Sequence, residues 1–164
     1  MRLISFFLLP FILTACGNEQ NAYLKPRNLI EFGIPLTILA PDSVDINKEN
    51  LGVQNEVTIA SEGSGEYEVR IYFGEATTSD VGVIKAQQLE FLKGTDIFSK
   101  VTLDEPNGFI YETKIDSSLY SYGFRRILVQ GNREYIFTSG SGIFTKAQAE
   151  EMYKATKPQE MRKQ

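Results

Sequence analysis

Residues 66–73 alternate between two kinds of side chain with the two-residue period of a β-strand. The apolar positions are Tyr67, Val69, Ile71 and Phe73. The positions between them are Glu66, Glu68, Arg70 and Tyr72. This pattern predicts a strand with one face on a core and the other face either wet or covered by a charged helix. Because a sheet buries its apolar face against another layer, the rest of the chain has to supply that layer.

Two stretches with a helical period can supply it. Asp80 is a good N-cap, and Gly94 stands where a C-cap glycine is expected. The face of this helix that we expect on the sheet consists of Val81, Ile84, Gln88, Phe91 and Leu92. A second helix is predicted over Lys146–Thr156, because Thr145 and Gln148 have capping-box spacing. Its packing face is Ala149, Met152, Tyr153 and Thr156.

Turn residues divide the rest of the chain into short strands. Those strands are Leu36–Ala40, Val53–Ser61, Ile97–Asp104, Phe109–Ile115, Tyr120–Gln130 and Arg133–Ser139. The tight turns are Glu62–Gly65, Glu105–Gly108 and Gly131–Asn132. We expect Val53, Val57 and Ile59 to point inward, and Asp42–Asn50 to be a polar turn region.

The order of three strands, a helix, four strands and a helix predicts an α+β domain, a mainly antiparallel sheet of about seven strands with two packed helices. Over residues 66–156 this order resembles the PsbP/Mog1-type fold, in which helices cover both sides of a curved antiparallel sheet. The resemblance rests on Phe124–Phe137, followed by the helix at Thr145–Thr156, and includes no diagnostic motif. Cystatin-like and lipocalin-like arrangements compete with it, and two long helices argue against the lipocalin-like one.

The start of the chain has the pattern of a signal peptide: cationic Met1–Arg2 and then an apolar run over Leu3–Leu13. A transmembrane helix needs about 20 apolar residues, so this run is too short to span a bilayer. The run ends in Leu-Thr-Ala15-Cys16, which resembles the lipobox of bacterial lipoproteins. That resemblance covers residues 1–16 and implies cleavage between Ala15 and Cys16, a diacylglyceryl group on the thiol, and acylation of the freed amine.

Two alternatives exist for Cys16, a small core residue or half of a disulfide. The chain has no second cysteine for a disulfide, and polar residues follow Cys16 directly. The lipobox interpretation also implies a location. Gly17 follows Cys16, whereas an aspartate there retains lipoproteins in the inner membrane of the best-known Gram-negative hosts. We therefore expect the outer membrane, or the outer face of the single membrane in a Gram-positive host.

These features divide the chain into four parts. Residues 1–15 are the signal peptide, residues 16–28 the lipidated N-terminus and a flexible tether, residues 29–158 one domain, and residues 159–164 a disordered tail. The signal peptide contains one of the 17 basic residues, so the mature chain carries 16 basic and 21 acidic side chains, a formal charge of −5. Nucleic acid is therefore an unsuitable partner.

The chain has no histidine, which excludes Ser-His-Asp and Cys-His catalysis and nearly all zinc sites. Lipidation of Cys16 removes the remaining thiol. The carboxylate pairs that a glycosidase would need have polar neighbours and resemble solvated faces; they are Glu66 with Glu68 and Glu150 with Glu151. Asp42, Asp45 and Asn47 alternate in a way similar to a calcium loop, but the glycine and the distal glutamate of an EF-hand are missing. We expect no cofactor besides the lipid on Cys16.

Aromatic side chains gather in the second half of the predicted sheet: Tyr111, Tyr120, Tyr122, Phe124, Tyr135 and Phe137. Most such residues belong to a core with their hydroxyls at its rim, but tyrosine is also common where a surface binds a partner. The candidate binding surface is Tyr120, Tyr122 and Arg125. Arg125 and Arg126 should point to opposite faces of their strand, with a cross-strand ion pair to Glu112 or Glu134 as the simplest role.

The sequence thus predicts a lipid-anchored envelope protein that binds or assembles with another envelope protein and catalyses nothing. The alternative is a carrier for a small hydrophobic or lipid ligand in a cavity lined by the sheet. A carboxylate-based hydrolase is the third and weakest interpretation.

We predict that the membrane-bound protein begins at Cys16 and is heavier than its peptide mass by the mass of its acyl groups, because the thiol is alkylated before cleavage. Mass spectrometry of the N-terminal peptide measures this directly. Cys16→Ser should abolish both the added mass and the cleavage. An unmodified Met1 on the membrane-bound protein would contradict the lipobox interpretation.

Overall fold

The computed structural model describes residues 23–63 and 65–158 of the 164-residue chain. The signal peptide, the lipobox with Ala15 and Cys16, and the tail at 159–164 lie outside the described residues. A chain that begins at Asn18 keeps every strand, helix and core residue described below.

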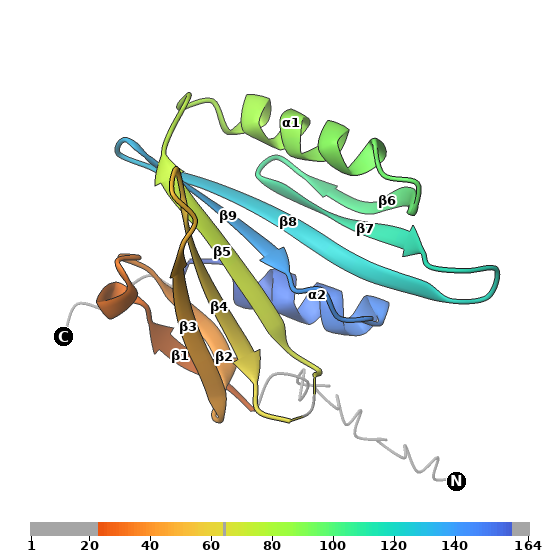
Figure 1. The fold of residues 1–164 in the computed structure, drawn as a ribbon, viewed down its shortest axis with the longest axis horizontal. Coiled ribbons are helices and arrows are strands. Elements are labelled where there is room, and N and C mark those ends of the chain that lie inside the picture. Colours follow the sequence, from red (N-terminus) through yellow and green to blue (C-terminus); the bar gives the residue numbers. More distant parts are fainter. Residues whose placement is uncertain (1–22, 64, 159–164) are drawn as a thin grey trace, which may run out of the picture.

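The main sheet has seven antiparallel strands in the spatial order β3-β4-β5-β9-β8-β7-β6 (Figure 1). Its strands are β3 (Val44–Asn50), β4 (Asn55–Ser61), β5 (Glu68–Glu75), β6 (Phe98–Glu105), β7 (Gly108–Lys114), β8 (Tyr120–Gln130) and β9 (Arg133–Ser139). A second, two-stranded sheet pairs β1 (Leu24–Asn28) with β2 (Thr37–Pro41), and a 3-10 turn at Ile30–Phe32 lies between them. The helices are α1 (Val81–Lys93) and α2 (Lys146–Ala155). The predicted α+β class, antiparallel sheet and two packed helices are confirmed.

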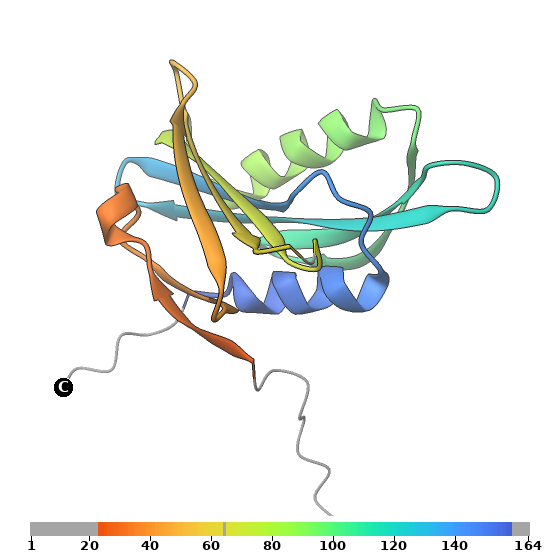
Figure 2. The same ribbon diagram turned by 60° about the horizontal axis from the view of Figure 1, so that its bottom comes forward.

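The two helices lie on opposite faces of the main sheet (Figure 2). Ile84 of α1 packs on Ile127 and Ile136, whereas Tyr153 of α2 packs edge-on against Phe124. Phe124 and Ile127 are an odd number of residues apart on β8, so their side chains point to opposite faces. The β1–β2 sheet covers the same face as α2 and contributes to its core.

The main core lies between the sheet and the layer formed by α2 and β1–β2. The four apolar positions predicted from the alternation of residues 66–73 all belong to it and are at most 4% exposed. The face of α2 predicted from its period is also buried: Ala149, Met152, Tyr153 and Thr156. Strand alternation and helical period therefore identified the two surfaces that meet in this core.

Both helices begin at the predicted residues. The Asp80 carboxylate accepts hydrogen bonds from the backbone amides of Gly82 and Val83, and Thr145 and Gln148 form the complete capping box. One position on the packing face of the first helix was predicted wrongly, because Phe91 is 68% exposed, whereas Leu92, predicted on the same face, is buried. Those two residues lie on adjacent sides of the helix, and the sheet reaches only one of them.

The polar stretch at 42–50 is not a turn region, because Val44–Asn50 forms the edge strand β3. Only Val44 and Ile46 pack against the main core, so the strand shows little of the apolar alternation that identifies buried strands. Val53 was also predicted wrongly, because it lies in the connection between β3 and β4 and is 97% exposed. Val57 and Ile59 do point inward and are fully buried.

Part of the expected tether is structured, since residues 24–28 form β1. Its pairing with β2 depends on backbone hydrogen bonds, and only Leu24 in it is buried. Pro26 fits because β1 is an edge strand, where a missing amide proton costs little. A strand that buries only one side chain shows almost no alternation of apolar and polar residues in its sequence, so it is not recognised from the sequence.

The two outer strands of the main sheet have features that oppose pairing with another chain. β3 carries Asp45, Lys48 and Glu49. The register between β6 and β7 shifts twice, between Phe98 and Lys100 and between Val101 and Leu103. Charges and bulges of this kind are common on exposed sheet edges.

We predict that Ile59→Ala lowers the free energy of unfolding by about 2–5 kcal/mol, because it leaves a cavity in the main core. Val53→Ala removes a side chain of similar size from solvent and should change stability by less than about 0.5 kcal/mol. Urea denaturation of the chain from Asn18 measures both. Equal losses in the two variants would contradict the burial described here.

Candidate functional site

Tyr120, Tyr122 and Arg125 do not form one surface. Tyr120 is exposed at the start of β8. Tyr122 is half-buried against the main core, and its hydroxyl donates a 2.8 Å hydrogen bond to Glu112. Arg125 lies on the opposite face, where it hydrogen-bonds Thr138 and its guanidinium lies 5.9 Å from the centre of the Tyr111 ring. Of the three residues, only Tyr120 is free to meet a partner.

Neither Arg125 nor Arg126 forms the expected ion pair with Glu112 or Glu134, and Glu112 has other partners. Glu112 accepts 2.8 Å hydrogen bonds from the Ser99 and Tyr122 hydroxyls and lies 3.5 Å from the Lys100 ammonium. These contacts favour the charged carboxylate, the Ser99 hydrogen bond most of all, and hold the pKa of Glu112 below the ordinary glutamate value.

One end of the sheet has a small concave surface, which we call the hairpin-end hollow. Its volume is about 190 Å³, and its lining includes residues of β7 and β8. These two strands form a hairpin that projects beyond the rest of the sheet (Figure 1). Its lining residues are Ile97, Tyr111, Thr113, Ile115, Ser121, Tyr122, Gly123, Ser139, Gly140, Ser141, Gly142 and Ile143. None of them carries a formal charge, so the hollow suits a neutral group.

Large apolar side chains stand exposed around this hollow. Ile143 is 59% exposed, and Ile97 and Ile115 are nearly half exposed. Leu119 and Tyr120 extend the exposed apolar surface along the hairpin, whose end is closed by a hydrogen bond from the Ile115 amide to the Leu119 carbonyl. Several exposed apolar side chains in one place are the usual mark of an interaction site on a soluble domain.

Small residues on β8 and after β9 make the hollow possible. At Gly123 a Cβ atom would lie 2.6 Å from the Tyr111 ring and 2.8 Å from the Ser139 hydroxyl. The loop that presents Ile143 is held in place by the next residue, Phe144. The Phe144 side chain is buried, and its backbone amide donates a 3.0 Å hydrogen bond to the Ser121 hydroxyl. Ile143 therefore points outward from a fixed loop.

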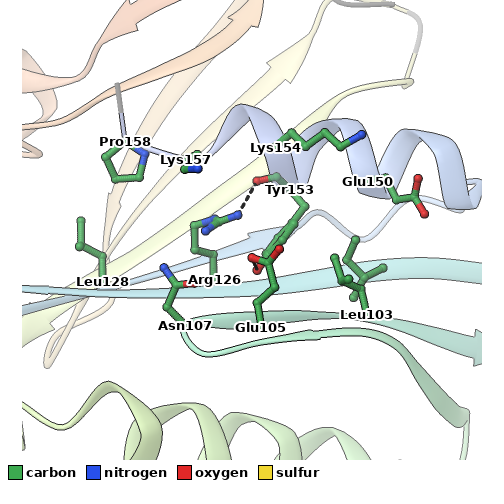
Figure 3. Close-up of a pocket in the computed structure, with 11 residues that line it drawn as sticks. Leu103, Glu105, Asn107, Arg126, Leu128, Glu150, Tyr153, Lys154, Lys157 and Pro158 are labelled. Atoms are coloured by element: carbon green, nitrogen blue, oxygen red, sulfur yellow. Dashed lines mark hydrogen bonds between the residues drawn. The ribbon is translucent and has the colours of Figure 1, made fainter. Parts of the chain in front are cut away.

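A larger pocket of about 680 Å³ lies between α2 and the β6–β8 side of the sheet (Figure 3). We call it the α2 pocket. Its lining residues are Leu103, Glu105, Asn107, Ile110, Arg126, Leu128, Glu150, Tyr153, Lys154, Lys157 and Pro158. Five of these are charged, so the pocket differs from the apolar, sheet-lined cavity expected for the carrier interpretation.

Arg126 lies at the base of this pocket and is 5% exposed. Its guanidinium lies 3.9 Å from the centre of the Tyr153 ring. Its Nε donates to the Thr156 hydroxyl at 3.3 Å, and its Nη2 donates to the Tyr153 carbonyl at 3.1 Å (Figure 3). Burial lowers the pKa of Arg126, against the opposing effect of the nearby Tyr153 and Glu105.

Tyr153 links the pocket wall to the sheet edge. Its hydroxyl donates a 2.8 Å hydrogen bond to Glu105 at the end of β6. Burial, and then this hydrogen bond, raise the pKa of Tyr153 well above that of a free tyrosine. The Tyr153 hydroxyl therefore stays protonated at neutral pH and can donate its hydrogen bond to Glu105.

Three of the other acidic groups singled out in the sequence are paired with cations. Glu68 accepts from Arg70 at 2.7 Å, and Glu150 lies 3.6 Å from Lys146. Asp42 binds Lys25 and lies 3.9 Å from Arg27. Within residues 23–63 and 65–158, no three acidic, cysteine or histidine side chains are placed to hold a metal ion.

Sequence reasoning missed both the hollow and the role of Arg126. Arg126 is an even number of residues from Phe124 and Leu128 and so shares their strand face, which made a cation at an inward position a usable signal. The exposed isoleucines carried a weaker signal, because Ile143 follows Gly-Ser-Gly and stands beside the equally apolar Phe144. Nothing local tells which of two adjacent apolar residues in a loop is buried.

No helix in the described part of the chain is both long enough and apolar enough to cross a bilayer. No protein-family model matches the sequence, and a search of curated proteins found none that is similar to it.

We predict that Glu112→Gln destabilises the protein at pH 7, because the amide loses the charge-assisted bonds to Ser99 and Tyr122 and the contact with Lys100. The folded protein holds the pKa of Glu112 below the ordinary value of 4.5. Its contribution is therefore present above pH 4.5 and is lost as the pH falls through the lowered folded pKa.

Melting temperatures of the wild type and the variant between pH 7 and pH 3 measure this loss. The difference between them should shrink at the acid end. Glu75→Gln is the matched control, because Glu75 is exposed at the end of β5. A difference that stays constant down to pH 3 would show that the charge of Glu112 is not what stabilises this region.

Proposed function

We propose that this protein is a non-catalytic, lipid-anchored module of the bacterial cell envelope, held in the outer membrane, which binds an envelope protein at the hairpin-end hollow. The observation that carries the proposal is the gathering of exposed apolar side chains around a neutral concave surface. The N-terminal pattern supplies the anchor.

The anchor makes an apolar patch on the domain unnecessary for membrane attachment. Two or three acyl chains on Cys16, at about 0.8 kcal/mol for each buried CH₂, hold a protein on a membrane essentially permanently. Six residues lie between Cys16 and Tyr23, and the seven Cα–Cα steps allow a span of at most about 25 Å. Exposed isoleucines on the domain therefore need another reason, and a protein partner provides one.

The chemistry of the hollow favours a protein over a lipid surface. Domains that bind membranes through a protein surface usually combine apolar side chains with lysine or arginine. The lining of the hollow has neither cation, and its surface is concave rather than projecting. A neutral hollow with hydroxyls and glycine backbone at its wall fits an apolar side chain together with the backbone that carries it.

The fold supports the same function by resemblance. We propose that the domain is PsbP/Mog1-like, because helices cover both faces of its antiparallel sheet and the chain ends in a strand, a turn, a strand and a closing helix. Members of that fold often serve as accessory subunits. A module that docks on a larger envelope protein would be consistent with this.

We predict that a photo-crosslinking benzoylphenylalanine in place of Ile143, in the full-length lipidated chain, forms one discrete adduct with an envelope protein. Ile115→Asp in the same chain should abolish the adduct, because it places a charge in the neutral hollow. Gel electrophoresis and mass spectrometry of irradiated cells measure the adduct.

The same probe at Val53 is the matched control, because Val53 is fully exposed and lies in the β3–β4 connection. An adduct with phospholipid alone, an adduct unaffected by Ile115→Asp, or equal labelling from Val53 would each refute binding at the hollow. The N-terminal mass of Cys16 is measured separately, so failure of the partner site and failure of the anchor are distinguishable.

A further inference from the structure

The α2 pocket contains a buried cation that forms no ion pair with a carboxylate of the described residues. Arg126 uses Nε for Thr156 and Nη2 for the Tyr153 carbonyl. Nη1 donates no hydrogen bond to any residue within the described part of the chain. Because Arg126 lines the pocket, an oxyanion there would meet a guanidinium that is already fixed in position.

The ring of Tyr153 fixes the plane of that guanidinium. The two groups are in cation–π contact at 3.9 Å, and Tyr153 is itself held by Glu105 and by the edge-on contact with Phe124. A planar cation held in this way loses little freedom when it binds a carboxylate. Such preorganisation is typical of a recognition site.

The rim of the pocket adds a second cation, Lys154, to the one at its base. Lys154 and Lys157 line the pocket beside Arg126, and Lys154 is exposed. Of the two carboxylates in the lining, Glu105 accepts from the Tyr153 hydroxyl and Glu150 lies 3.6 Å from Lys146. Neither of these carboxylates forms an ion pair with Arg126 or Lys154, so these two cations suit a ligand with a single negative charge.

The remaining lining is apolar. Leu103, Ile110, Leu128 and Pro158 belong to it, and Leu103 is more than one-third exposed. A volume of about 680 Å³ falls within the range of small-molecule sites, roughly 300–1,000 Å³. A ligand that filled the pocket would therefore place an uncharged part against leucine and proline.

We propose that the α2 pocket binds a small organic acid, with its carboxylate on Arg126 and Lys154 and its apolar body against Leu103 and Leu128. This site is separate from the hairpin-end hollow and does not depend on the protein partner. The two sites share no lining residue.

Isothermal titration of the chain from Asn18 with decanoate tests the proposal. Decanol supplies the same tail without the charge, and acetate supplies the carboxylate without the tail. We expect decanoate to bind at least tenfold more tightly than either compound. Equal binding of decanol would refute the role of the cations, and equal binding of acetate would refute the role of the apolar lining.

Two variants locate the site. Lys154→Gln, on an exposed position, should weaken decanoate binding about threefold, the effect of one solvent-exposed charge pair. Arg126→Lys keeps the charge but loses the planar donor fork, and should weaken binding at least tenfold. Lys114→Gln is the matched control, since Lys114 is also exposed but lies outside the pocket lining.

Melting temperatures without ligand show whether each variant is folded, and the exposed Lys154→Gln keeps the test valid if Arg126→Lys is unstable. Unchanged decanoate affinity in Lys154→Gln, or an equal loss in Lys114→Gln, would overturn the proposal.

Discussion

The contacts of Tyr153 hold α2 on the sheet, and much of the structure depends on them. One ring packs against Phe124, lies under the guanidinium of Arg126, and carries a hydroxyl that donates to Glu105. The first contact belongs to the core, the second to the pocket and the third to the edge strand β6. Gly108 permits this close approach, because a Cβ atom there would lie 2.7 Å from the Tyr153 hydroxyl. A single side chain thus joins three strands to the helix.

Burial on both faces explains the composition of β8. Phe124 faces α2 and Ile127 faces α1, so this strand lacks the simple alternation of a sheet with one wet face. Arg126 is tolerated in it because the Tyr153 ring and two oxygen acceptors replace part of its hydration. The site and the core are therefore built from the same strand.

The parts of the fold that could be predicted are those in which the order of apolar and polar side chains matches their burial. β5 and both helices have apolar periods or caps that act locally, and β8 and β9 are delimited by turn residues, so the positions of these elements follow from the sequence. β1 and β3 could not be predicted, because edge strands depend on backbone pairing and bury few side chains. Phe91 and Ile143 were ambiguous for a related reason. Packing against residues that are distant in sequence decides which of two adjacent apolar residues is buried. The local sequence pattern contains no information about that packing.

An open sheet has two exposed edge strands. The features of these edges affect whether copies of this chain can pair with one another when they lie close together. β3 is charged, and β6 departs twice from regular register with β7. An incoming strand would meet charges at one edge and misaligned donors and acceptors at the other. Neighbouring copies that meet often would therefore collide without joining their sheets. Both outer edges of the main sheet are therefore poor templates for the addition of a strand.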